Sequence, residues 1–134
     1  KTKGDNALQS FDKSYHLPSF KLNGSFSSAR LDILSYLRGA SSQGVLQFQS
    51  EDPSKKEKTF VSHGANFIEG MSFLTIKNLL NKVDQLAEGE GVKIRFEFFL
   101  GYLVGLEIQI DYLHSIGFTE VYRDEGTIFM EKQY

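Results

Sequence analysis

The chain has 134 residues, 40% of them hydrophobic, which is enough for one domain with a sizeable core. Fifteen basic residues against seventeen acidic ones leave a formal net charge of −2, so we expect no attraction to nucleic acid or to an anionic membrane. The absence of cysteine excludes disulfides, zinc–thiolate sites and a cysteine nucleophile. No run of the sequence approaches the roughly 18 apolar residues of a membrane span, so we expect no membrane insertion and a cytoplasmic location.

The first 17 residues are polar, with only a few scattered apolar side chains. They predict an N-terminal extension that packs partly or not at all and ends at Pro18. We expect residues 18–134 to form a single domain.

The first third of that domain predicts a strand, a short helix and a hairpin. Apolar and polar residues alternate from Phe20 to Phe26, which is typical of a half-buried strand. The next segment predicts a helix, because three leucines recur in it at three-residue spacing: Leu31, Leu34 and Leu37. Two alternating segments, Val45–Ser50 and Lys58–Ser62, flank a charged loop with a proline and predict a β-hairpin.

The rest of the domain alternates between helices and strands. An apolar stripe predicts a helix from about Ser72 to Glu88, and glycines follow it. Val92–Phe98 predicts a strand with one buried and one solvent face, which favours a sheet covered by helices on one side only. Leu106–Ile116 predicts another helix, and residues 119–131 a closing hairpin. The elements together predict an α+β domain whose mixed, mostly antiparallel sheet carries about three helices.

The most interesting polar segment runs from His63 to Ser72. It joins a histidine, an asparagine, a glutamate and two glycines to the start of the longest helix, where free backbone N–H groups can hold an anion. The alternative is an ordinary connection between strand and helix. The binding candidates in this segment are His63, Asn66, Glu69, Gly70 and Ser72.

The sequence contains no recognisable catalytic constellation. None of its three histidines has the spacing to a second ligand that a metal site needs, so we expect no metal. Tyr102, in the apolar stretch Gly101–Gly105, is a further binding candidate. It either lies on an exposed patch that receives a partner or packs into the core.

Residues 20–70 resemble the PatA N-terminal (PATAN) domains of bacterial signalling proteins. The matching features are Leu22-x-Gly24-Ser25, a helix over Asp32–Leu37, Gly44-Val45-Leu46, and a returning strand over Thr59–Gly64. This resemblance implies a non-catalytic interaction or regulatory module. Phe67-Ile68-Glu69 is also similar to the opening of a helix in STAS domains, although Gly70 stands where that family carries its phosphorylated serine.

The C-terminal end resembles the last third of a GNAT-type acetyltransferase. Ile110–Phe118 and Ile128–Lys132 look like that family's closing helix and hairpin. The resemblance implies acetyl-CoA as a substrate, bound at a Q/R-x-x-G-x-G/A loop. Phe67–Ser72 is the only candidate loop, and it lacks the leading polar residue and the final small one. Leu113 stands where the family has its tyrosine general acid, and Tyr112 is one position away.

These patterns favour a non-enzymatic regulatory or interaction domain of bacterial signalling proteins, which acts through a protein partner and without a cofactor. The alternative is a divergent GNAT-type acetyltransferase that binds acetyl-CoA near Gly70–Ser72. A STAS-like regulatory domain is the third hypothesis.

Overall fold

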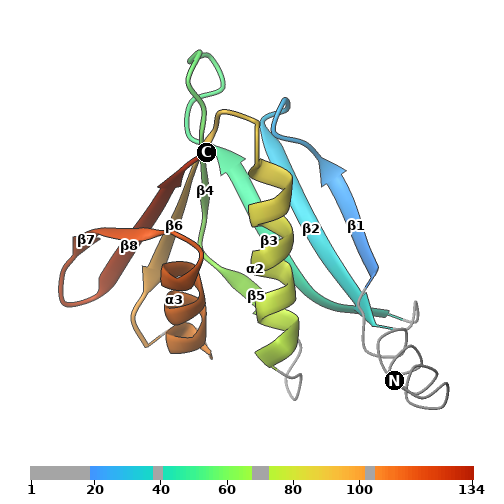
Figure 1. The fold of residues 1–134 in the computed structure, drawn as a ribbon, viewed down its shortest axis with the longest axis vertical. Coiled ribbons are helices and arrows are strands. Elements are labelled where there is room, and N and C mark those ends of the chain that lie inside the picture. Colours follow the sequence, from blue (N-terminus) through green and yellow to red (C-terminus); the bar gives the residue numbers. More distant parts are fainter. Residues whose placement is uncertain (1–18, 38–40, 68–72, 102–104) are drawn as a thin grey trace, which may run out of the picture.

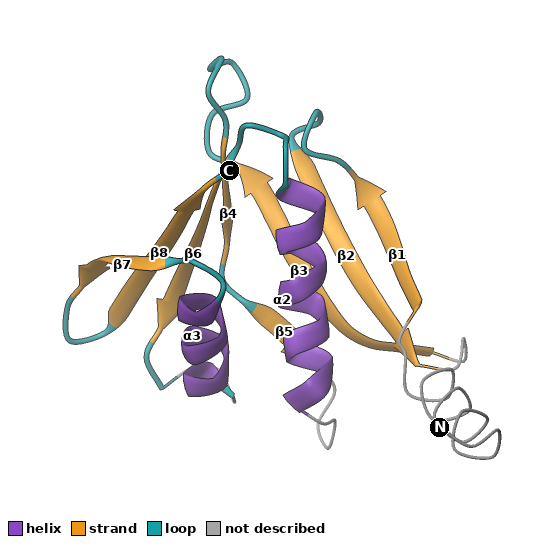
Figure 2. Cartoon of the chain, in the orientation of Figure 1, coloured by secondary structure: helices purple, strands orange, loops and turns teal. Residues whose placement is uncertain are grey.

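A computed structural model describes residues 19–37, 41–67, 73–101 and 105–134 (Figure 1). In chain order the elements are β1 (Ser19–Gly24), β2 (Arg30–Leu37), β3 (Ser41–Ser50), β4 (Thr59–Ser62), β5 (Ala65–Phe67), α2 (Phe73–Ala87), β6 (Lys93–Phe99), α3 (Leu106–Ser115), β7 (Thr119–Arg123) and β8 (Thr127–Gln133). The strands form one eight-stranded sheet, and both helices lie on the same face of it (Figure 2).

The sheet is mixed and mostly antiparallel, as predicted. Its order is β1-β2-β3-β4-β6-β8-β7, and β5 pairs with β3 beside this path. The pair β4–β6 is parallel, and every other pair is antiparallel. Because β4 and β6 are parallel, the chain has to cross over between them, and α2 is the main element of this crossover (Figure 1).

The helix predicted over the leucines at 31, 34 and 37 is wrong, because this segment is strand β2. Its residues also alternate: Leu31 and Ile33 are buried, while Asp32 and Leu34 are partly exposed. Strand β2 pairs with β1 on one edge and with β3 on the other, and this pairing overrides a local pattern that fits a helix equally well. The described residues therefore contain two helices instead of about three.

The other predicted elements are confirmed to within a few residues, with two differences at their ends. The first strand ends at Gly24, and its Leu22 is 42% exposed instead of facing the core. The segment that follows Ser62, expected as a connection to the helix, forms the short strand β5 before the chain reaches α2.

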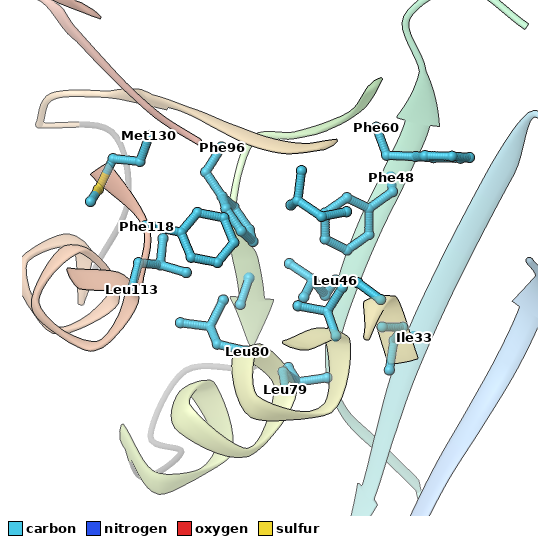
Figure 3. Packing of buried hydrophobic residues seen from close by; sticks show 14 of the residues in the cluster. Ile33, Leu46, Phe48, Phe60, Leu79, Leu80, Phe96, Leu113, Phe118 and Met130 are labelled. Atoms are coloured by element: carbon cyan, nitrogen blue, oxygen red, sulfur yellow. The ribbon is translucent and has the colours of Figure 1, made fainter. Parts of the chain in front are cut away.

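The core lies between the helices and the inner face of the sheet, and aromatic rings make up its centre (Figure 3). Phe96 of β6 is in contact with rings on both sides of it. Its ring centroid lies 5.6 Å from that of Phe48, 5.7 Å from Phe98 and 5.5 Å from Phe118. Burial of such rings is a large stabilising term, and here it holds β6 next to the first half of the sheet.

Candidate functional site

The sheet divides between β5 and β6. Strands β4 and β6 pair from Thr59–Lys93 to Ser62–Phe96. Beyond that point β5 stays with β3, whereas β6 continues beside β8, and no pairing joins β5 to β6 in the described residues. Figure 1 shows the two strands diverging below β4. We call this opening the fork.

A one-residue bulge stands at the apex of the fork. Gln49 pairs with Val61, but Leu46 pairs with Ala65, so β4 and β5 contain one residue more than the facing part of β3. Such a bulge bends a strand and turns its next residues in a new direction. Gly64 makes the bend with φ 103°, and a Cβ atom here would lie 2.6 Å from Phe98. The bend therefore requires glycine.

Gln109 of α3 occupies the inner side of the fork. Its side chain is fully buried. Its Oε1 accepts a hydrogen bond from the Ala65 N–H at 2.9 Å, and its Nε2 donates to the Ala65 carbonyl at 3.3 Å. These two backbone groups point away from β3, towards the side on which β5 has no neighbouring strand. The glutamine thus satisfies a strand edge that the fork would leave without partners.

A row of charged side chains crosses the helix-free face of the sheet at the fork. Arg95 Nε donates to Glu131 at 2.7 Å, and its Nη1 lies 3.3 Å from Glu51 and 3.4 Å from Glu97 Oε2. Burial opposes the charge on Arg95, but the hydrogen bond to Glu131 and the charges of Glu51 and Glu131 outweigh it, so its pKa is raised. Arg95 therefore remains a fixed cation that holds the Glu97 carboxylate.

Glu97 faces His63 across the apex of the fork. Its Oε1 lies 4.0 Å from His63 Nε2, and the two residues would be the next pair if the β4–β6 ladder continued. The His63 ring packs edge-on against Phe99, with 5.3 Å between the ring centroids. The imidazole is accessible, since 65% of the side chain is exposed. An accessible imidazole with an oriented carboxylate beside it has the arrangement of a general base.

A hollow of about 330 Å³ adjoins this pair on the same face. Its lining consists of Arg30, Gln47, Gln49, Val61, Ser62, His63, Gly64 and Asn66. We call it the His63 hollow. A larger hollow of about 490 Å³ lies next to the loop at residues 51–58, but it includes no residue of the fork apex, and its lining contains both lysines and acidic residues. Of these two hollows, the His63 hollow is thus the one that adjoins the imidazole of His63 and the carboxylate of Glu97.

The structure brings together two of the predicted binding residues, His63 and Asn66, in one hollow. The candidates Glu69, Gly70, Ser72 and Tyr102 lie outside the described residues.

Sequence reasoning missed Glu97 and Gln109. Glu97 had the pattern of an ordinary outward residue of a strand, and Gln109 that of a polar residue on a helix. Only the parallel pairing of β4 with β6 places Glu97 next to His63, and the position of α3 over the fork brings Gln109 to Ala65.

Leu113, at the position where the GNAT resemblance implies a tyrosine, is fully buried in the core. Tyr112 is half-buried. Burial, together with the nearby charge of Asp84 on α2, raises the pKa of Tyr112. Its hydroxyl is thus influenced by α2, and Gln109, one turn before Leu113, is the α3 residue that reaches the fork.

Comparison with known proteins identifies this fold. No family model matches the sequence, and no curated protein matches it. Among solved structures, the N-acetyltransferase PseH of Campylobacter jejuni in complex with acetyl coenzyme A has a TM-score of 0.55 and 14% identity, and the match covers 79% of this chain and 69% of that one. An acetyltransferase of the GNAT family from Streptococcus pneumoniae gives 0.56 and 14%, covering 79% and 68%. An acetyltransferase from Thermus thermophilus gives 0.55 and 14%, covering 96% and 71%. The chain therefore has the fold of the GNAT acetyltransferases.

These findings correct the leading hypothesis from the sequence. A non-enzymatic signalling domain is contradicted, because the structural neighbours are acetyltransferases. The PATAN resemblance required a helix over residues 32–37, which is part of β2, and the STAS resemblance required Phe67 to open a helix, whereas it ends β5. The GNAT resemblance of the C-terminal end agrees with α3 and the β7–β8 hairpin.

Among the described residues, no helix is long and apolar enough to cross a membrane. The expected absence of a cofactor stays unconfirmed, since one neighbour is solved with acetyl coenzyme A. The expected protein partner stays a prediction.

Proposed function

We propose that the protein is an acyltransferase that binds acetyl-CoA in the fork and transfers the acetyl group to an amine. The observation that carries this proposal is the fork itself, with its one-residue bulge and an edge of β5 that no described strand pairs with. The GNAT fold supports it, as does the neighbour whose structure contains acetyl coenzyme A.

The chain offers backbone groups that fit the donor. The N–H and carbonyl of Ala65 are already bonded to Gln109, so the next backbone groups on this edge of β5 are those of Phe67. There the amide groups of a pantetheine arm can pair with the strand edge as an added strand does. Helix α2 begins after the fork, and its first turn carries no acidic residue, so its positive end is available to phosphates. The loop before it, with Glu69, Gly70 and Ser72, remains the candidate for holding them.

His63 and Glu97 are suited to general-base catalysis. An amine attacks a carbonyl only after it has lost its proton. His63 can take that proton at Nδ1, while Glu97 beside Nε2 stabilises the resulting imidazolium. Bound acetyl-CoA supplies an activated acyl carbon: the C–N bond forms, the C–S bond breaks, and the thiolate leaves. Because Leu113 replaces the family's tyrosine, the thiolate regains its proton from the imidazolium or from water.

Acetyl-CoA binding tests the proposal directly. Ligand at a hundredfold over Kd adds about 2.7 kcal/mol to the free energy of unfolding, which for a domain of this size raises the thermal midpoint by several degrees. Calorimetric titration with acetyl-CoA, CoA and adenosine 3′,5′-bisphosphate separates the contributions of the acyl, pantetheine and nucleotide parts. No heat and no thermal shift at millimolar acetyl-CoA would overturn the proposal.

A further inference from the structure

The His63 hollow has a composition that selects among acceptors. The inference drawn here rests on the proposed acetyl transfer. The helices and the aromatic core fill the inner face of the sheet, so an acceptor that reaches the fork approaches across the helix-free face (Figure 2). The His63 hollow is the concave site on that approach.

The lining of the hollow contains no carboxylate, and Asp32 and Glu97 lie beside its Arg30 and His63. Arg30 is its permanent cation, His63 contributes an imidazole, and three side chains with carboxamides complete its main polar groups: Gln47, Gln49 and Asn66. A polycationic acceptor would meet Arg30 and would find no carboxylate in the lining to bind, because the neighbouring Asp32 is already paired with Arg30. An anionic group would find a guanidinium and amide N–H donors.

Arg30 is held in a way that leaves donors for a ligand. Its Nε donates to both oxygens of Asp32, at 3.1 and 3.3 Å, and among the described residues these are its only side-chain hydrogen bonds. Asp32 thus orients the guanidinium through Nε, and the terminal N–H groups keep the planar arrangement that matches a carboxylate. The arginine is 52% exposed, so these groups are accessible to a small molecule.

The sheet register sets the distance between the two ends of the hollow. Arg30 pairs with Gln49, which pairs with Val61, two residues before His63. With strands about 4.8 Å apart and about 3.4 Å per residue, the two backbones are roughly 12 Å apart. The length of the arginine side chain shortens the gap between the functional groups. A volume of about 330 Å³ is at the lower end of the range for small-molecule sites.

We propose that the acceptor is a small amine that also carries a carboxylate, with the amine at His63 and the carboxylate on Arg30. Primary amines matched in length test this class. 4-Aminobutyrate is compared with 4-aminobutanol, and β-alanine with 3-aminopropanol, in an assay that follows release of the CoA thiol. We expect the acidic member of each pair to have the higher kcat/KM.

Arg30→Met should lower kcat/KM at least tenfold for the acidic amines, mainly through KM, and leave the neutral amines within about twofold, because a hydrogen bond to a charged group is lost. Arg30→Lys should restore part of the loss. The matched control is Arg123→Met: Arg123 is 53% exposed and paired with Glu120 on its own strand, but it does not line the hollow. This variant should behave like the wild type.

The outcomes separate the two proposals. If acetyl-CoA binds but the acidic amines are neither preferred nor acetylated, or if Arg30→Met affects both classes equally, the acceptor assignment is overturned and the donor proposal stands. If acetyl-CoA does not bind, both are overturned. The thermal midpoint of each Arg30 variant should equal that of the wild type, which verifies that a loss of rate is not a loss of fold.

Discussion

Replacing Gln109 tests whether a side-chain amide completes the divided sheet. Gln109→Met keeps the length of the side chain but removes both hydrogen bonds to Ala65. Each buried backbone group left without a partner costs about 1–3 kcal/mol, so for the two groups we expect the free energy of unfolding to fall by about 2–6 kcal/mol. In Gln109→Ala the free energy of unfolding should fall by about a further 1–3 kcal/mol, because the smaller side chain also leaves a cavity.

Urea denaturation followed by circular dichroism measures both losses. Gln85→Met on the exposed side of α2 is the matched control, and it should change the free energy of unfolding by less than about 0.5 kcal/mol. A Gln109→Met variant as stable as this control would refute the reasoning, since the edge of β5 would then not depend on the glutamine.

Two further predictions concern the fork and the last hairpin. His63→Ala should lower kcat by roughly 10²–10⁴-fold without changing the affinity for acetyl-CoA, and Glu97→Gln should lower kcat less. The control is His114→Ala, which removes an exposed histidine on α3. An unchanged kcat in His63→Ala would exclude this histidine as the base. Asp124 accepts hydrogen bonds from the hydroxyl of Tyr122 and from the backbone N–H of Gly126, and the former is the larger cause that lowers its pKa to about 2. Because this pKa is lower in the folded state, the carboxylate contributes stability above about pH 4 that is lost as the pH falls towards 2, so the thermal midpoints of wild type and Asp124→Ala should converge over that range. A constant difference between them would contradict this assignment.

The sequence predicts correctly those elements whose apolar residues fit either the helical period or the two-residue period of a strand, but not both. In α2 the buried residues recur every three or four positions, and in β6 every second position, so neither segment has a competing interpretation. Strand β2 was mistaken for a helix because Leu31, Leu34 and Leu37 satisfy one period while Leu31 and Ile33 satisfy the other. What decides between them is pairing with β1 and β3, which no local pattern contains.

The candidate site could be predicted only in part, for a related reason. His63 and Asn66 stood out as polar residues near glycines, and the structure places them in one hollow. Glu97 is more than thirty positions further along, and it meets His63 because two parallel strands share a register. A glycine inside an alternating segment, as Gly64 is, was the one local indication of a bulge.

The parallel pairing of β4 and β6 also has a consequence for how the chain folds. On either side of it the sheet grows from short antiparallel connections, β1 to β4 in the first half and β7 to β8 in the second. The contact between the halves spans only Thr59–Lys93 to Ser62–Phe96 and can form only once the long crossover has closed. Loop-closure entropy delays such non-local pairing relative to local hairpins. The two halves of the sheet are therefore expected to fold early and separately. The insertion of Phe96 among its neighbouring rings then joins them as a late step.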